Sequence, residues 1–406
     1  MSEWKKVKLG ELYEVHNGLS KGRQFFGTGF PFLTFSNVFN NWFLPEQLES
    51  LVQTTDKERE ACSIKAGDVF ITRTSETMNE LGMSSVALKD YPNATYNGFT
   101  KRLRPKTDRV FPRYMGYYLR TPKFRGQFMA FSSMTTRASL ANNDLLNMEV
   151  ELPPMDIQKN IATILSRYDS LIENYQKQIK LLEEAARRLY KEWFIDLRFP
   201  GHENTKIVDG LPEGWENKKI SDVCETVGGG TPSTKVPAYY KGGRIKWVTP
   251  TDITRNNCIC LLDTDKKITE EGLRNSSTKM VPAGTILMTS RASVGYFGIA
   301  DFEVCTNQGF ISCIPIPNMQ MYLLFNLMSR VDEIRKKAGG STYLEISKSV
   351  FRNFDIVCPS EIILLQFQDK ASLVLKKEKT LSLQIRLLTE ARDRLLPKLM
   401  SGEITV

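Results

Sequence analysis

Residues suited to catalysis or metal binding are sparse in this sequence. His16 and His202 are the only histidines, which nearly excludes a site built from clustered imidazoles. The seven cysteines are odd in number and contain no Cys-x-x-Cys pair, so neither a zinc ribbon nor a disulfide framework is expected. We expect reduced, mostly buried thiols in a reducing compartment, and no bound metal.

The motifs of common nucleotide-using enzymes are also missing. Pro153-Pro154 follows Leu152 and precedes Met155, so the Asn/Asp-Pro-Pro-aromatic tetrad of adenine methyltransferases is absent. There is no Gly-x4-Gly-Lys-Ser/Thr phosphate loop, and the run Gly228–Ser233 is not a Gly-x-Gly-x-x-Gly turn. The sequence therefore predicts a protein that is not an enzyme, with an unrecognised active site as a disfavoured alternative.

Side chains that position phosphates and read base edges are plentiful in the loops. Each also has a structural interpretation: Gly230-Thr231-Pro232-Ser233 fits a tight turn, and Asp252 fits a helix N-cap. The candidates for nucleic-acid contact in the first part of the chain are Lys21, Arg23, Ser36, Asn37, Arg73, Thr74, Asn97, Lys101, Arg102, Arg104, Thr135, Thr136 and Arg137. Those in the second part are Thr231, Ser233, Lys235, Thr249, Thr251, Asp252, Arg291, Ser293, Asn307 and Gln308.

Positive charge is concentrated in one segment. The 406 residues include 55 Lys and Arg against 46 Asp and Glu, a net charge of +9. The segment Lys101–Arg137 alone carries this whole excess, interleaved with Tyr114, Tyr117, Tyr118 and Phe124. Clustered basic and aromatic residues are typical of a polyanion-binding face. A solvated surface helix is an equally good interpretation of the segment taken alone.

Self-comparison shows that the chain is a tandem duplication. The first copy and the second match in the same order at a nearly constant offset. An arginine, Arg73 or Arg291, closely follows the Ala-Gly match in each copy, and we expect the two to occupy the same place. The matches pair Trp4 with Trp215, Gly18 with Gly229, Phe32–Val38 with Trp247–Ile253, Ala66–Thr72 with Ala283–Thr289, Asn97–Phe99 with Gln308–Phe310, and Glu184–Leu189 with Glu390–Leu395.

Each copy begins with short apolar runs between turn residues and ends in a long stretch with a helical period. The apolar positions recur every three or four residues, as in a coiled coil, so the two helices should pair with each other. Glu378 and Arg392 occupy two positions of the stripe that would otherwise be apolar. The expected pairing residues are Ile161, Ile164, Tyr168, Leu171, Tyr175, Leu182, Leu189, Phe367, Val374, Leu381, Ile385, Leu388 and Leu395.

These patterns predict an α/β (α+β) protein in which two similar globular domains are separated by two long helices that pair as a coiled coil, with pseudo-twofold symmetry. Hydrophobic residues make up 41% and charged residues 25% of the chain, as in ordinary globular proteins, and no run is long enough to cross a membrane. We expect a cytoplasmic protein. The predicted boundaries are 1–155 for the first domain, 156–198 for its helix, 199–212 for a linker, 213–359 for the second domain, 360–400 for its helix and 401–406 for a tail.

Five motifs together point to a family. Gly228–Ser233, Trp247–Ile253, Arg291–Gly295 and Asn307–Phe310 occur in that order, and Arg394–Ile404 closes the chain. Over its full length the chain resembles the DNA-specificity subunit of type I restriction–modification systems. The first copy departs from the pattern, with Asn17-Gly18-Leu19-Ser20-Lys21-Gly22 in place of the Gly-Thr-Pro-Ser run. Such divergence is expected where the two copies read different sequences.

The resemblance implies two target-recognition domains, each reading one half of a split, asymmetric site in double-stranded DNA. The helices would form an antiparallel coiled-coil spacer and dock two modification subunits, which bind S-adenosylmethionine and methylate adenine N6. Two further restriction subunits, which use ATP and Mg²⁺ to translocate DNA, would complete the restriction enzyme of a phage-defence system. No cofactor is expected in this chain. The alternative is a non-enzymatic two-domain coiled-coil scaffold for protein or glycan ligands.

The expected helix length agrees with a spacer role. A helix of about forty residues is roughly 60 Å long. This exceeds the ~34–36 Å between half-sites one turn of DNA apart.

Overall fold

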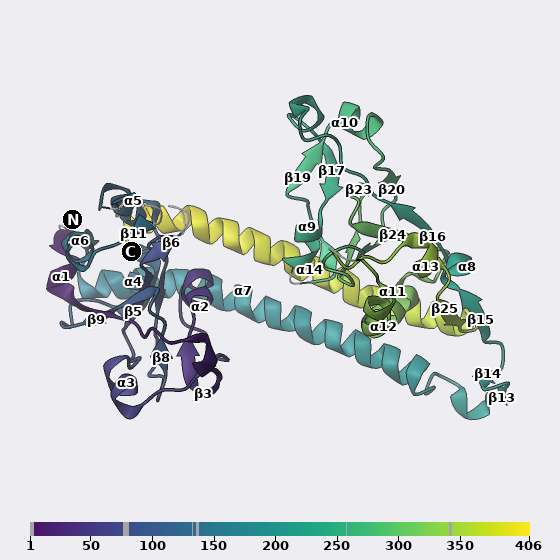
Figure 1. The fold of residues 1–406 in the computed structure, drawn as a ribbon, viewed down its shortest axis with the longest axis horizontal. Helices are drawn as coiled ribbons and strands as arrows, with labels where there is room; N and C mark the ends of the chain where they lie inside the picture. The colour runs from purple at the N-terminus through teal and green to yellow at the C-terminus, as the bar shows by residue number, and fades with distance from the viewer. Residues whose placement is uncertain (1–3, 76–80, 132, 135–137, 257, 341–342) are drawn as a thin grey trace. The chain divides into compact units, whose positions relative to one another are not determined.

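The computed structural model describes residues 4–75, 81–131, 133–134, 138–256, 258–340 and 343–406 (Figure 1). The chain divides into two compact units, one formed by Met1–Ser170 with Thr389–Val406 and the other by Leu171–Leu388. Strands and helices alternate in both units, which confirms the mixed α+β class. Among the described residues, no helix is long and apolar enough to span a membrane.

The first unit is built around a four-stranded sheet of order β2-β9-β5-β7, in which every described pairing is antiparallel. The residues of the central strand β5 are all buried, as their apolar run predicts. Smaller sheets are ordered β4-β3-β8, β10-β11-β6 and β1-β12. The strands are β1 (Lys5–Lys8), β2 (Tyr13–Asn17), β3 (Phe26–Leu33), β4 (Leu51–Val52), β5 (Val69–Thr72), β6 (Thr74–Ser75), β7 (Ser84–Val86), β8 (Thr95–Tyr96), β9 (Thr100–Pro105), β10 (Ser133–Met134), β11 (Ala138–Ser139) and β12 (Glu149–Leu152).

Short helices connect these strands. Two of them begin at a threonine whose hydroxyl accepts a hydrogen bond from the first helical turn, Thr34 for α2 and Thr55 for α3. The helices are α1 (Leu9–Leu12), α2 (Phe35–Asn40), α3 (Asp56–Ala61), α4 (Pro112–Tyr118), α5 (Pro122–Phe131) and α6 (Asn142–Asn147), with a 3₁₀ turn η1 at Arg23–Phe25.

The second unit has a similar arrangement of sheets, and its main sheet has one strand more than that of the first unit. Its main sheet has the order β16-β24-β21-β22-β18, and a second sheet has the order β19-β17-β23-β20. The strands are β13 (Ile207–Val208), β14 (Leu211–Pro212), β15 (Glu216–Lys219), β16 (Cys224–Gly228), β17 (Ile245–Val248), β18 (Cys260–Leu261), β19 (Lys266–Ile268), β20 (Met280–Val281), β21 (Ile286–Thr289), β22 (Phe297–Ala300), β23 (Val304–Thr306), β24 (Phe310–Pro315) and β25 (Asp355–Cys358). The short helices are α8 (Ile220–Val223), α9 (Pro250–Thr254), α10 (Glu270–Arg274), α11 (Gln320–Ser329), α12 (Val331–Lys337) and α13 (Lys348–Arg352), with 3₁₀ turns η4 (His202–Asn204) and η5 (Pro237–Tyr239).

The hydrogen-bond register confirms the duplication and corrects its alignment. Phe70 pairs with Arg102 in the first unit, and Leu287 pairs with Ser312 in the second. The amide of Asn97 donates to the carbonyl of Leu33, as the amide of Asn307 does to Val248. Asn97 therefore corresponds to Asn307, one residue earlier than sequence comparison predicts.

The same correction applies to the two arginines. The amide of Arg73 donates to the carbonyl of Phe99, and the equivalent amide, that of Ser290, donates to Gly309. Arg73 thus corresponds to Ser290, while Arg291 corresponds to Thr74. Because successive side chains of an extended strand point to opposite faces, the prediction that Arg73 and Arg291 occupy the same place is wrong. A one-residue shift is invisible in the sequence because an arginine follows the strand in both copies.

Two long helices extend from the units, α7 (Met155–Tyr190) and α14 (Glu361–Met400). A π-helical turn (Lys191–Ile195) continues the first of them. In the first unit the start of α7 packs on the end of α14, through Ile161 and Leu165 against Leu396 and Leu399. In the second unit the end of α7 packs on the start of α14. The helices therefore run antiparallel, as predicted.

The predicted pairing residues differ in burial. Ile161, Phe367 and Leu381 are buried, whereas Leu171 is 44% exposed. Leu171 is therefore a weak member of the stripe. The remaining predicted pairing residues are half-buried: Ile164, Tyr168, Tyr175, Leu182, Leu189, Val374, Ile385, Leu388 and Leu395.

The linker predicted over 199–212 is more ordered than its polar composition suggests. Phe199 is buried, and its ring centroid lies 5.1 Å from that of Trp215. The strands β13 and β14 that follow form a hairpin. The segment is therefore fixed to the core of the second unit by an aromatic contact.

Candidate nucleic-acid interface

The loop Gly228–Ser233 of the second unit is held against the end of β23. The amide of Gly230 donates to Thr306, and Trp247 Nε1 donates to the carbonyl of Gly230 at 3.0 Å. A Cβ on Gly229 would lie 1.9 Å from the carbonyl oxygen of Asn307, so this position requires glycine. Gly18 meets the carbonyl oxygen of Asn97 in the same way, at 2.0 Å. The close approach explains why this glycine occurs in both copies.

A turn at Asn307 carries the next part of the surface. Asn307 Oδ1 accepts a hydrogen bond from the amide of Gly309 at 2.9 Å, which fixes a side-chain-capped turn. The turn presents the exposed Gln308, which accepts a hydrogen bond from the hydroxyl of Thr231. Asn307 itself is thus mainly a turn residue, while Thr231 and Gln308 form a joined polar pair.

Arg291 lies beside this turn and is exposed. Its Cβ is 4.0 Å from the position that a Cβ on Gly309 would take. The Arg291 guanidinium is 3.6 Å from the Glu345 carboxylate, and both side chains are nearly half exposed, so this ion pair is weak. Ala292 adopts a left-handed conformation with φ of 61°, which non-glycine residues rarely do and which often marks functional sites. Arg291 is therefore available to an anion.

The other candidates of the second unit fall into two groups. Asp252 is committed to structure, because one of its carboxylate oxygens accepts hydrogen bonds from the Thr249 amide and hydroxyl, both at 2.7 Å. These contacts cap α9, and the structural interpretation fits both residues. By contrast, the exposed candidates of this unit are Thr231, Ser233, Lys235, Thr251, Arg291, Ser293 and Gln308.

Sequence reasoning missed two residues at this surface. Tyr343 is 60% exposed in the loop that carries Glu345. This loop lies beside Arg291, because the Ala292 amide donates a hydrogen bond to the carbonyl of Leu344. Lys348 is exposed, and its Nζ lies 3.1 Å from the position of a Cβ on Gly228. The duplication could have pointed to Tyr343, because its loop is the second copy of the segment in which Thr135, Thr136 and Arg137 were candidates.

The candidates of the first unit whose burial the structure describes are less exposed than those of the second. Lys21 Nζ forms an ion pair with Glu58 at 2.7 Å, and Asn37 closes the N-terminal cap of α2 with Thr34. Asn97 is buried, and its amide donates to Leu33 while its Oδ1 accepts from the Phe99 amide. Arg23 and Ser36 are exposed.

Lys101 and Arg73 form a pair of like charges. Lys101 is 4% exposed, and its ammonium donates to the side-chain oxygens of Asn17 and Asn142. Burial and the nearby Arg73 lower the pKa of Lys101. Arg73 Nε is buried without a hydrogen-bond partner among the described residues. Thr74 lies in β6, and Thr135, Thr136 and Arg137 lie outside the described residues.

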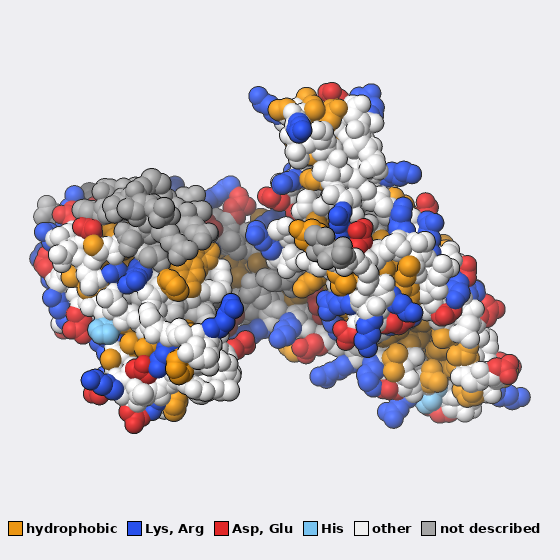
Figure 2. Space-filling model, viewed as in Figure 1, with side chains coloured by type: hydrophobic (Ala, Val, Ile, Leu, Met, Phe, Trp, Pro, Cys, Tyr) orange, Lys and Arg blue, Asp and Glu red, His pale blue; other side chains and the backbone are white. Residues whose placement is uncertain are grey.

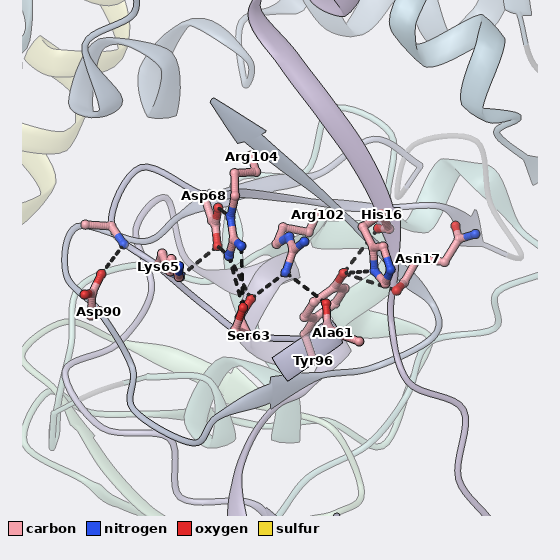
Figure 3. Close-up of polar contacts among 11 residues, drawn as sticks. His16, Asn17, Ala61, Ser63, Lys65, Asp68, Asp90, Tyr96, Arg102 and Arg104 are labelled. Atoms are coloured by element: carbon pink, nitrogen blue, oxygen red, sulfur yellow. Dashed lines mark hydrogen bonds and ion pairs between the residues drawn. The ribbon is translucent and has the colours of Figure 1, made fainter. Parts of the chain in front are cut away.

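Arg102 and Arg104 point inward, toward the loop that follows α3 (Figure 3). Arg102 donates to the carbonyl oxygens of Ala61 and Ser63. Arg104 binds Asp68 through two nitrogens, at 2.8 and 2.6 Å, and Asp68 is fully buried. The predicted role of these two arginines at a nucleic-acid face is not supported, because both guanidinium groups hold the loop to β9.

Arg120 is committed in the same way. Its guanidinium donates to four backbone carbonyls, those of Val38, Phe39, Asn41 and Ser84, at 2.6 to 3.0 Å. Four aromatic residues of the predicted polyanion-binding face are buried: Tyr114, Tyr117, Tyr118 and Phe124. The described part of the segment Lys101–Arg137 is therefore neither a continuous binding face nor a solvated helix, because much of it lies in the core of the first unit.

Figure 2 shows Lys and Arg side chains spread over the visible face of the second unit, including the part that carries α10, β17 and β19. Acidic side chains are interspersed among them. The described residues contain no cluster of three or more metal-ligating side chains. The described thiols are free, and six of them are buried, as predicted. The arrangement offers hydrogen-bonding and cationic groups on loops that the sheets hold rigid.

Comparison with known proteins places these features in a family. A model described as the type I restriction modification DNA specificity domain matches residues 1–184 and 212–373. The chain is 26% identical over its whole length to the MjaIX specificity subunit of Methanocaldococcus jannaschii, covering 94% of that protein. It is 24% identical to the HindI specificity subunit of Haemophilus influenzae, with full coverage of both.

A solved structure supports the fold. The S subunit of a type I restriction–modification system from M. genitalium is similar with a TM-score of 0.58 and 14% identity, and the match covers 98% of this chain and 96% of that one. The family model matches twice, once in each copy of the duplicated fold, over most of the chain. The chain belongs to the family of type I restriction–modification DNA specificity subunits.

Proposed function

We propose that each unit reads one half of a bipartite, asymmetric DNA site. The supporting observation is that equivalent positions of the two copies carry different side chains on the same backbone frame. Thr74 corresponds to Arg291, and Gly98 corresponds to Gln308 by the register of β9 and β24. Two domains with the same loops but different hydrogen-bonding groups would read different base edges.

The two long helices set the distance between the half-sites and dock two adenine-N6 methyltransferase subunits in this proposal. A helix of 36 residues, the length of α7, rises about 54 Å. The methyltransferases bind S-adenosylmethionine, and restriction subunits that use ATP join through them. In this proposal the chain positions the DNA and catalyses no reaction itself. The methyltransferase partner extracts the target base from the stack and modifies it. A scaffold for protein or glycan ligands is the alternative.

Inserting one heptad in each helix tests the spacer. The insertions follow Gln176 in α7 and Leu383 in α14, and they preserve the apolar period. Each adds about 10 Å, or roughly three base pairs at 3.4 Å per step. Methylated sites are then mapped across the genome of a host that carries the methyltransferase subunits. We expect unchanged half-site bases and a longer gap.

An active mutant with an unchanged gap would contradict the spacer role. Changed half-site bases would instead show that the helices help to read the sequence. If the DNA affinity of the wild-type protein did not fall as the salt concentration rises, the result would favour the scaffold function, because proteins that bind DNA phosphates lose affinity steeply with salt.

A further inference from the structure

A cavity of about 470 Å³ lies in the second unit, between the two long helices and the loop that follows α9. It is separate from the loops that carry Thr231, Arg291 and Gln308, none of which lines it. Its volume lies within the usual range of small-ligand sites, about 300–1,000 Å³. Nothing in the proposed reading of DNA by those loops uses this cavity.

Three cations from three elements line the cavity: Lys180 of α7, Arg255 after α9 and Arg386 of α14. The three residues are exposed, and within the described part of the chain their side chains have no ion-pair or hydrogen-bond partner. Cations that line one cavity without ion-pair partners repel one another. An anion placed among them would relieve this repulsion.

The one carboxylate that lines the cavity is already engaged. Glu183 Oε1 accepts a hydrogen bond from the amide of Ile259 at 3.0 Å, and its other oxygen lies 3.6 Å from Arg187. Burial raises the pKa of Glu183. Glu183 is therefore a poor internal partner for the three cations, and the cavity keeps an excess of positive charge.

Hydrogen bonds within the chain hold the floor of the cavity. Cys258 Sγ lies 3.2 Å from Ser382 Oγ, which joins the loop to α14. Asn256 Nδ2 donates to the carbonyls of Cys258 and Cys260, at 2.8 and 3.0 Å. These contacts hold Asn256 and Cys258 in place next to Arg255, so ligand binding would cost little conformational entropy.

We propose that this cavity binds a phosphate group, with Arg255, Arg386 and Lys180 as its ligands. Two guanidinium groups and an ammonium suit phosphate because the planar guanidinium donates two parallel hydrogen bonds to its oxygens. The phosphate comes either from a nucleic-acid backbone or from a free phosphorylated molecule. The nucleic-acid source rests on the proposed function; the phosphate site itself does not.

Titration of the purified full chain with pyrophosphate, measured by isothermal calorimetry, tests the site. We expect saturable binding, weakened roughly tenfold or more in the double variant Arg255→Gln/Arg386→Gln, because the variant lacks two of the three cationic ligands. Arg188→Gln is the matched control, because Arg188 is an exposed arginine of α7 that does not line the cavity. Thermal unfolding of each variant confirms that it is folded.

Competition identifies the source. A duplex of unrelated sequence that displaces pyrophosphate from the wild type and binds the double variant more weakly assigns the site to the DNA backbone. Displacement by mononucleotides but not by the duplex assigns it to a free phosphorylated molecule. Absence of saturable pyrophosphate binding, an equal loss in Arg188→Gln, or displacement by an acidic peptide alone would overturn the proposal.

Discussion

Three arginines of the first unit and two of the second serve opposite uses. In the first, Arg102, Arg104 and Arg120 point inward and bind backbone carbonyls or Asp68. In the second, Arg255 and Arg291 are exposed. The basic segment of the first unit carries the whole net charge of the chain, yet these three of its arginines are bound inside the fold. A count of positive charge therefore does not locate a binding face, because a guanidinium also satisfies buried carbonyl groups.

The largest effect is expected from Arg120→Met. The substitution leaves four backbone carbonyls without their donor, and burial already lowers the pKa of Arg120 to about 10. We expect a loss of about 3–5 kcal/mol in the free energy of unfolding of the first unit, measured by urea denaturation.

Arg113→Met is the control, because Arg113 is exposed and its guanidinium lies over the Phe43 ring, 5.7 Å from the centroid. The control should change stability by less than about 1 kcal/mol. Equal effects of the two substitutions would remove the distinction between inward and outward arginines.

Glu378→Gln tests the polar position in the stripe of α14. Glu378 is 1% exposed, and burial, with a smaller contribution from Glu183, raises its pKa to about 8. The folded state therefore holds this proton more tightly than the unfolded state, and wild-type stability falls as pH rises from about 5 to about 8. The amide that replaces the carboxyl group cannot ionise, so the variant should lack this part of the decline.

We expect the variant to exceed the wild type by roughly 2–4 kcal/mol at pH 9 and to match it near pH 5. Thermal unfolding across this range provides the measurement. Parallel pH profiles for the two proteins would show that Glu378 does not titrate in this range.

Arg291→Ala tests the exposed arginine of the second unit. If the guanidinium contacts DNA, affinity for the cognate duplex should fall by about 1–3 kcal/mol in a fluorescence anisotropy titration. The melting temperature should stay the same, because the ion pair with Glu345 is nearly half exposed and contributes little. Unchanged affinity with a lower melting temperature would make Arg291 a structural residue like Arg104.

The smallest effect is expected from Lys235→Gln. Lys235 is exposed in the loop that follows Gly228–Ser233. If Lys235 contacts a phosphate, the substitution should weaken binding to cognate and unrelated duplexes equally, by about 1 kcal/mol or less. The slope of log affinity against log salt concentration should also become shallower by about one unit. A loss confined to the cognate duplex would assign Lys235 to base reading instead.

Local patterns located much of the fold. The stretches free of Gly and Pro predicted both long helices to within a few residues at their starts, because a period of three and four residues reports a helical face directly. Gly18 and Gly229 were matched correctly, since the close approach to a carbonyl oxygen permits no other residue. The alignment failed by one residue at Asn97 and Arg73, where turn residues occur on both sides.

The candidate site was predicted less completely. Thr231, Arg291 and Gln308 lie together, as their ordered motifs indicate, but Asp252 and Asn37 serve as helix caps. Short polar side chains can cap a helix or contact a ligand, and spacing alone does not separate these uses. Lys348 became visible only in the tertiary structure, which brings its Nζ to 3.1 Å from the position of a Cβ on Gly228.

The sequence by itself determined the duplication, the two helices and the family, because repeats, periods and ordered motifs are properties of residue order. The tertiary structure decided which charges are free. Arg104 lies within β9 and Arg291 follows β21, and the first meets the buried Asp68 while the second meets the exposed Glu345. The partner of a side chain is set by residues distant in sequence, and its burial decides whether the charge is committed to the fold or available to a ligand.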